Sequence, residues 1–214
     1  MKDNVNFGEY IEQVVNKTES KIDGVMVNRM VLQSAVGVAM AAIEILDQLK
    51  KHIFYVKKDD AGNLIRTRPV SAEAVREQIE AIDLFLGDLQ GSLYDVNNVD
   101  EDELIEVDAR LLHGVLGKVT EGGEMLLALT PAITEGVDID LVNLSEEMGD
   151  DQWYNGVILD VLHQNIGTTL SSLLVQNGNK LLKGRYKGGT FNADEAANRD
   201  LNTERQILEA GNGG

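Results

Sequence analysis

The 214-residue sequence contains no cysteine, only two prolines and few aromatic residues, which make up 5% of the chain. Without cysteine the chain can form neither a disulfide framework nor a zinc–thiolate site. Proline, the strongest helix breaker, occurs only at Pro69 and Pro131. Long stretches rich in Leu, Ala, Glu and Val favour helices, and no alternating β pattern competes with them. We therefore predict an all-α protein.

Basic residues are scarce as well, since 19 Lys and Arg stand against 36 Asp and Glu, for a formal net charge of −17. A surface of this sign repels a polyanion, so we expect no nucleic-acid partner. The 43% of hydrophobic residues are enough to bury a core. We find neither a signal-peptide pattern nor an apolar run long enough to span a membrane, and we expect a cytoplasmic protein without a membrane partner.

Two pairs of acids stand out between Leu111 and Leu162. Glu121 and Glu124 are three residues apart, as are Glu147 and Asp150. On a helix, side chains at this spacing are neighbours, with roughly 5–6 Å between Cβ atoms. Two such pairs facing each other would supply four hard oxygen ligands for Mg²⁺, whose other positions go to water and substrate phosphates.

The spacing alone carries little weight, because it recurs by chance in any acidic helix. The neighbouring residues add to it. At about 100° per residue, the first pair shares a helix face with His113 and Gly117, and the second pair leads into the apolar stripe of Val157, Ile158 and Val161. Acids on an inward face are unfavourable unless they are paired or bind a metal. The pattern therefore favours a metal site over a solvated face.

The combined string resembles one protein family. H-x3-G-x3-E-x2-E, from His113 to Glu124, is followed further along the chain by E-x2-D inside N-L-x-E-E-x-G-D-x2-W-Y. This is similar to the MazG-like, all-α nucleoside triphosphate pyrophosphohydrolases. The similarity continues in N-x2-K-L-x3-R-Y at residues 177–186 and in the tail with Arg199 and Glu204, and it covers roughly residues 108–209.

The resemblance implies a Mg²⁺-dependent hydrolase, with Mn²⁺ as a substitute, that converts a nucleoside or deoxynucleoside triphosphate to the monophosphate and pyrophosphate. It assigns catalysis and metal binding to Glu121, Glu124, Glu147 and Asp150, phosphate binding to Lys180, Arg185 and Arg199, and base binding to His113, Trp153 and Tyr154. The general base, the phosphorus attacked and the base and sugar preference stay open.

An N-terminal segment mirrors the acidic one. Residues 31–49 align with residues 111–129 without gaps, which places Gly37 on Gly117 and Glu44 on Glu124. The other acids are replaced in this segment by Ala41, Gln78 and Ala81. We predict a MazG-like helical bundle with a degenerate internal duplication, a pseudo-dimer in one chain, although any two amphipathic helices can be aligned this well.

The predicted domains are a degenerate, structural copy at 1–98 and a catalytic copy with the C-terminal basic segment at 99–214, packed as one unit. Members of the family commonly build a four-helix site from two chains, and this chain could build it alone. A further homodimer is compatible with the sequence.

Local signals set the expected helix boundaries. Asn28 and Ser71 are expected to cap helices that run to about Val56 and Tyr94, and Asn143 or Ser145 to cap the second acidic helix. The first acidic helix is expected from about Glu101 to Leu129, ended by Pro131. Further helices are expected at 7–20, 168–182 and 193–208. A calcium loop at 95–106 is rejected, because Val99 cannot bind the ion and Asp100 replaces the required glycine.

Rival functions come from two classes. The phosphoribosyl-ATP pyrophosphatases and the dUTPase/dCTPase-like branch share the acid framework of the family. A catalytically inactive helical partner that binds a nucleotide or a protein is the rival from another class. All four acids are present in the C-terminal copy, which favours the enzyme.

Overall fold

The computed structural model describes residues 6–19, 24–66, 68–94, 104–186 and 189–211. The chain is mostly helical, which confirms the predicted all-α class. It divides into two compact units, one formed by Met1–Val25 and Glu106–Leu174 and the other by Met26–Ile105 and Val175–Gly214. The domain boundary predicted at residues 98 and 99 falls outside the described residues.

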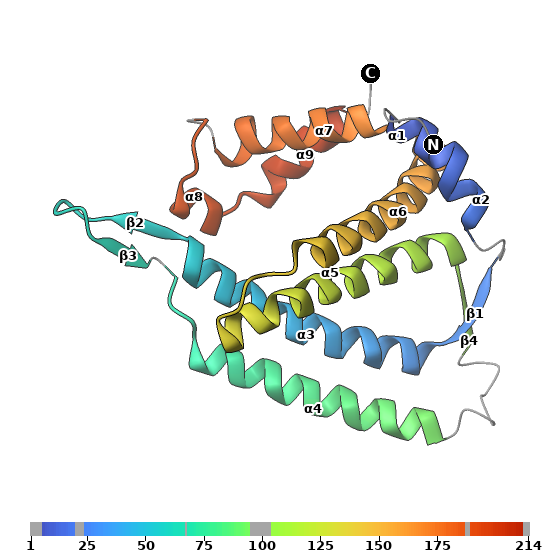
Figure 1. Ribbon diagram of the computed structural model, residues 1–214, viewed down its shortest axis with the longest axis horizontal. Coiled ribbons are helices and arrows are strands. Elements are labelled where there is room, and N and C mark those ends of the chain that lie inside the picture. Colours follow the sequence, from blue (N-terminus) through green and yellow to red (C-terminus); the bar gives the residue numbers. More distant parts are fainter. Residues whose placement is uncertain (1–5, 20–23, 67, 95–103, 187–188, 212–214) are drawn as a thin grey trace. The chain divides into compact units, whose positions relative to one another are not determined.

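The first unit is built on two long helices that run side by side in opposite directions (Figure 1). They are α5, Ala109–Glu135, and α6, Leu141–Ile166. The N-terminal segment of this unit consists of α1, Phe7–Tyr10, the π-helix η1, Ile11–Val15, and α2, Asn16–Thr18. It packs on α6 where the fully buried Val15 meets Gly156 and lies near the equally buried Val157.

The second unit contains the other long hairpin, α3, Arg29–Phe54, and α4, Ala72–Tyr94 (Figure 1). A two-stranded antiparallel sheet of β2, Val56–Lys58, and β3, Leu64–Arg66, connects its helices. Its C-terminal part holds the end of α7, Leu170–Asn179, the π-helix η4, Lys180–Arg185, α8, Ala193–Ala197, and α9, Leu201–Gly211. The chain thus has two helices where one was predicted at 193–208.

Short polar side chains fix where the long helices begin. The Asn28 side chain accepts a hydrogen bond from Val31 N, and the Ser71 hydroxyl accepts one from Ala74 N, as predicted. The second acidic helix begins earlier than predicted, because Asp140 rather than Asn143 or Ser145 accepts from the backbone N–H groups at its start. Gly167, at φ 67°, ends this helix in the left-handed conformation.

The expected boundaries of the first acidic helix are wrong at both ends. It starts at Ala109, capped by Asp108, and it continues through Pro131 to Glu135. Pro131 removes one backbone hydrogen bond without ending the helix, and the hydroxyls of Thr130 and Thr134 donate to carbonyls one turn back on either side of it. The helix ends at Gly136, which has a φ of 70° and so adopts the left-handed conformation that glycine favours at helix ends.

Short strands also interrupt the predicted all-helical pattern. Two strands, β1, Val25–Asn28, and β4, Leu104–Val107, form a two-stranded sheet. The rejected calcium loop at 95–106 lies mostly outside the described residues, and its end belongs to β4 rather than to the acidic helix expected there.

The expectation that no apolar run is long enough to span a membrane is wrong for α3. Its most apolar 18-residue window has a mean hydropathy of 1.6, enough by length and composition to cross a membrane. The core helix of a soluble protein passes the same test, so this helix alone decides nothing about a membrane.

Candidate metal centre

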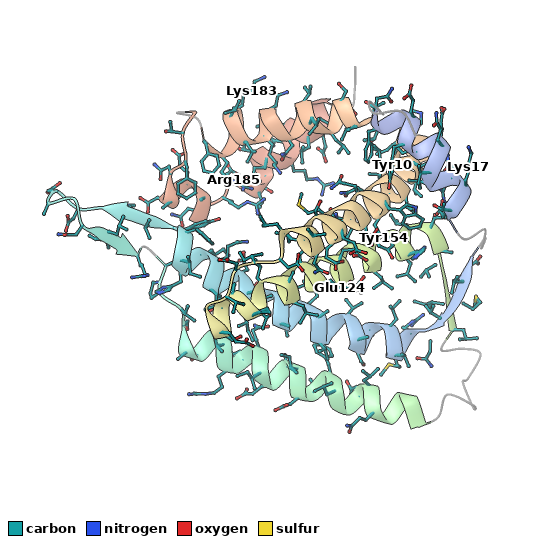
Figure 2. All side chains as sticks on the ribbon, viewed as in Figure 1. Tyr10, Lys17, Glu124, Tyr154, Lys183 and Arg185 are labelled. Atoms are coloured by element: carbon teal, nitrogen blue, oxygen red, sulfur yellow. The ribbon has the colours of Figure 1, made fainter. Side chains whose placement is uncertain are left out.

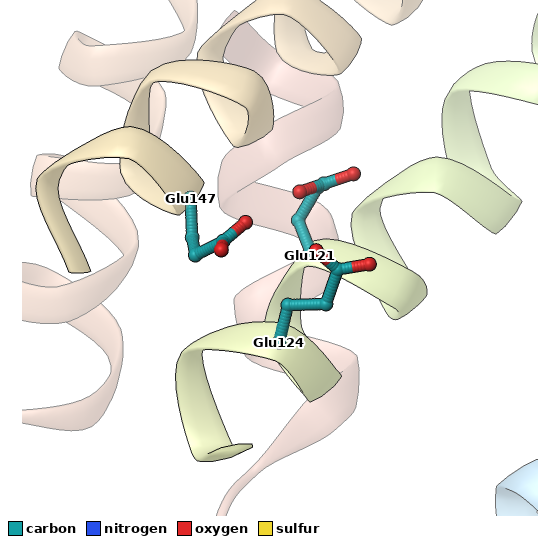
Figure 3. A group of neighbouring side chains, drawn as sticks. All are labelled: Glu121, Glu124 and Glu147. Carbon is teal, nitrogen blue, oxygen red and sulfur yellow. The ribbon is translucent and has the colours of Figure 1, made fainter. Parts of the chain in front are cut away.

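Three of the four predicted metal ligands come together between α5 and α6. Glu121, Glu124 and Glu147 each offer a carboxylate oxygen, and these oxygens all lie within 4.8 Å of one another. Figure 3 shows Glu147 reaching from α6 toward the two glutamates of α5. The two helices thus bring together acids from separate stretches of the sequence, and we call these three residues the acid cluster.

The acid cluster concentrates negative charge at a buried place. Glu121 is 8% exposed and Glu147 is 9% exposed, while Glu124 lies on the exposed side. Burial raises the pKa of Glu121, and the negative charges of Glu124 and Asp150 raise it further. Burial also raises the pKa of Glu147, as do its hydrogen bond with Glu124 and the charge there. Both groups are held in a setting that opposes ionisation unless a cation is added.

Asp150, the fourth predicted ligand, lies one turn beyond Glu147 on α6 and outside the acid cluster. Its negative charge nevertheless raises the pKa of Glu121 and of Tyr154. It also raises the pKa of Tyr10, after the larger effect of burial there. The N-terminal segment therefore approaches the acidic face of α6, which no sequence signal indicated because Tyr10 and Asp150 lie far apart along the chain.

Tyr154 joins the acid cluster to an aromatic group. Its ring occupies the space above Gly117, where an added Cβ would lie 2.1 Å from the ring atom Cε1. Only glycine permits this approach of α5 to α6, which explains the glycine of the H-x3-G-x3-E string. Burial and the charge of Glu121 raise the pKa of the Tyr154 hydroxyl. Figure 2 labels Tyr154 and Glu124.

The three predicted base-binding residues form one cluster of rings. The ring centroids of His113 and Trp153 are 5.6 Å apart, those of His113 and Tyr154 5.5 Å, and those of Trp153 and Tyr154 5.0 Å, all edge to face. Trp153 Nε1 donates a hydrogen bond of 2.8 Å to Thr18 Oγ1. His113 also lines a cavity of about 360 Å³ together with Leu112, Leu116 and Arg110. We call the three rings the aromatic cluster.

The three predicted phosphate-binding residues belong to the second unit. Arg185 donates from Nε and Nη2 to the two carboxylate oxygens of Glu204, at 2.9 and 3.1 Å. Arg199 Nη2 donates to the same carboxylate at 2.7 Å. Lys180 is the first residue of η4 in the same unit. The structure thus joins both arginines to a carboxylate, and their role toward phosphate stays a prediction.

A basic residue that the sequence analysis missed lies close to the acid cluster. Lys118, on α5, forms an ion pair with Asp151 on α6. Asp151 is in turn close enough for its charge to raise the pKa of Glu121. Lys118 precedes Glu121 by three positions, and this spacing could have predicted a positively charged side chain beside the acid cluster.

Comparison of the chain with family models, with curated proteins and with solved structures finds no match.

Proposed function

We propose that the first unit is a Mg²⁺-dependent nucleoside triphosphate pyrophosphohydrolase. The observation that carries the proposal is the acid cluster, in which three carboxylates, two of them buried, converge within 4.8 Å. Among the residues that the structure describes, none of the three forms an ion pair with Lys or Arg. Such a group is stable when ionised only if a cation joins it, and a set of hard oxygen donors suits Mg²⁺.

The roles of the residues follow from this assignment. Glu121, Glu124 and Glu147 would hold Mg²⁺, which would supply the positive charge that offsets the charge developing as the phosphoanhydride bond breaks. A carboxylate beside the ion would accept the proton of the attacking water. Lys118 can release Asp151 and contact a phosphate oxygen, because it lies one turn from Glu121 on the same helix.

The aromatic cluster supports a nucleotide as the substrate. His113 precedes Glu121 by two helical turns on α5, which is about 12 Å along the helix axis. A nucleoside triphosphate can span a distance of this order with its base at the rings and its phosphates at the acid cluster. The cavity beside His113 has the Arg110 guanidinium in its lining, so it offers both an apolar wall and a polar edge to a base.

The two long hairpins match in the positions of their capping residues and of their facing rings, which supports the proposed MazG-like duplication. The alignment that places Gly37 on Gly117 also places the cap Asn28 on the cap Asp108. In the second helix of each hairpin, one register places the cap Ser71 on the cap Asp140 and Phe85 on Tyr154.

The contacts between the helices correspond as well. Gly37 faces the Phe85 ring in the first hairpin, as Gly117 faces the Tyr154 ring in the second. Buried Ala41 stands at the place of Glu121, so the first hairpin keeps this packing without the acid cluster.

Pyrophosphate release from nucleoside and deoxynucleoside triphosphates, measured with and without Mg²⁺, tests the proposal. We expect turnover with Mg²⁺, and we expect Glu147→Gln to lower kcat by about a hundredfold or more, since loss of one charge-stabilising group commonly has this effect. Glu44→Gln is the matched control, because Glu44 is the counterpart of Glu124 in the other hairpin, and it should leave kcat unchanged.

The result separates the proposal from its rival. Absence of turnover across all common triphosphates, with nucleotide binding retained, would favour the catalytically inactive partner. Turnover restricted to dUTP or dCTP, or to phosphoribosyl-ATP, would assign the chain to one of the two related branches instead.

A further inference from the structure

A second cavity lies at the other end of α6. It has a volume of about 680 Å³, which is within the range of small-molecule sites. Phe7 and Ile11 of the N-terminal segment form one wall, Leu159 of α6 another, and the first turn of α7 closes it with Leu174. We call this the α6 end cavity.

The α6 end cavity is separate from the acid cluster. Leu159 and His163 lie about 18 and 24 Å beyond Glu147 along the helix axis. At about 100° per residue they lie on the side of α6 that faces away from Glu147 and Tyr154. A nucleotide bound at the acid cluster therefore does not reach this cavity.

The charged groups of the cavity wall are acidic. Glu12 and Asp160 contribute carboxylates, and no Lys or Arg is among the described residues that line it. Asp160 Oδ2 accepts from Arg110 Nη2 at 2.9 Å and from Gln164 Nε2 at 2.7 Å, and the same Arg110 Nη2 is also 2.7 Å from Glu19 Oε2. One guanidinium thus serves two carboxylates, and Glu12 adds a further negative charge.

The helix start in the wall does not reverse this sign. The N-terminus of α7 carries a partial positive charge, and Ser172 N of its first turn is already bonded. Thr169 N donates to Ser172 Oγ, and Ser172 N donates to Thr169 Oγ1. The partial charge of a helix N-terminus is about half a unit charge, which is smaller than the full charge of Glu12, so the wall remains acidic.

His163 adds a hydrogen-bond acceptor to the same wall. Its Nδ1 lies 3.1 Å from the carbonyl oxygen of Thr168. A carbonyl can only accept, so this bond places a hydrogen on Nδ1, and in the tautomer with its hydrogen there Nε2 is an acceptor. These side chains thus offer acceptors to a ligand, while Phe7, Ile11, Leu159 and Leu174 are apolar.

We propose that the α6 end cavity binds a protonated organic amine with a small apolar or aromatic group. The ammonium donates to Glu12, Asp160 and His163, and the apolar group packs against Phe7 and Ile11. This assignment is independent of the proposed hydrolase, because it uses another face of α6.

Binding of phenethylamine, measured by titration calorimetry on the full chain, tests the proposal. The neutral analogue 2-phenylethanol has the same apolar group and lacks the charge. We expect one amine per chain and weaker binding of the alcohol. Glu12→Gln should weaken amine binding by about fivefold, as expected for loss of one partly exposed charge pair. Glu9→Gln, also on the N-terminal segment but outside the cavity wall, should leave the affinity unchanged.

Two space-filling variants locate the bound amine. Gly8→Leu and Ser171→Phe each place a large side chain into the cavity from opposite walls, and both should weaken binding by about tenfold or more while circular dichroism shows the same helix content. Glu147→Gln should not change binding. Equal affinity for amine and alcohol, unchanged binding in both filled variants, a loss of binding in Glu147→Gln, or no saturable binding at millimolar concentration would each overturn the proposal.

Discussion

Two sets of buried carboxylates, Glu204 in the second unit and the acid cluster in the first, lie in opposite electrostatic surroundings. In the second unit Glu204 is 4% exposed and is held by two guanidinium groups, which lower its pKa to about 2. In the first unit Glu121 and Glu147 are buried to a similar degree, and burial followed by the charges of neighbouring acids raises their pKa. The same residue type is thus stabilised as an anion in one place and destabilised in the other.

The contrast distinguishes a structural acid from a candidate functional one. The Glu204 carboxylate is bonded through both of its oxygens and joins η4 to α9, so it contributes to folding without any ligand. The acid cluster has like charges at short range, which cost folding free energy unless a proton or a cation is bound. Buried acids that lack a cationic partner are therefore the better candidates for metal binding.

We expect the largest loss of stability at Glu204, whose carboxylate is paired with two guanidinium groups. Glu204→Gln removes the carboxylate and leaves Arg185 and Arg199 without their shared partner, which we expect to destabilise the protein by about 3 kcal/mol. Glu209→Gln is the matched control, because it lies on the same helix in an exposed ion pair with Arg205 and should change stability by less than about 0.5 kcal/mol. Urea unfolding followed by circular dichroism measures both, and similar midpoints for the two variants would contradict the structural role of Glu204.

The pH dependence of Glu204 gives a second test of the same site. Its pKa is lowered from 4.5 in the unfolded chain to about 2 in the folded protein. Its contribution is therefore fully present above pH 4.5 and is lost as the pH falls through the folded pKa of about 2. The difference in unfolding free energy between the wild type and Glu204→Gln should shrink between pH 5 and pH 3, out of a total of about 2 kcal/mol. A difference that stays constant over this range would contradict the lowered pKa.

A third test compares the two hairpins through their glycines. Gly117→Ala would place a Cβ 2.1 Å from the Tyr154 ring, and Gly37→Ala would place one 2.6 Å from the Phe85 ring. Both should destabilise the protein by about 1–2 kcal/mol, because the rings have to move in packed surroundings. Only Gly117→Ala should also lower Mg²⁺-dependent turnover, since it alone displaces a ring beside the acid cluster. Gly122→Ala, at a position with open space, is the control.

Much of the fold can be predicted because it depends on local chemistry. Asn28 and Ser71 begin α3 and α4 as predicted, since a cap is a contact within one turn. The same reasoning misplaces the start of α6, because several capping residues lie close together there and Asp140, rather than Asn143 or Ser145, begins the helix. The prediction that Pro131 ends α5 is wrong, because the helix continues through this proline and stops at Gly136.

The candidate site is predictable to the extent that it follows helix periodicity. The three residues of the acid cluster follow from the pattern, since Glu121 and Glu124 share one helix face and the paired spacing of α6 mirrors them. The contact of Arg185 and Arg199 with Glu204 does not follow from such a pattern, because the tertiary fold, and not the periodicity of one helix, brings these residues together. The tertiary fold also brings Tyr10 toward Asp150, and no sequence pattern predicts this approach.

The smallest effect, and the one that bears most directly on the contrast, concerns the acid cluster without its cation. Glu121→Gln imitates the protonated acid, so in the presence of a chelator we expect it to stabilise the protein by about 0.5–1 kcal/mol. Adding Mg²⁺ should raise the Tm of the wild type in proportion to the logarithm of its concentration and should raise that of the variant less. Glu135→Gln, at an exposed position at the end of α5, controls for the loss of one charge. A wild type that gains nothing from Mg²⁺, with Glu121→Gln less stable under all conditions, would show that the acid cluster is a structural feature like Glu204 and binds no cation.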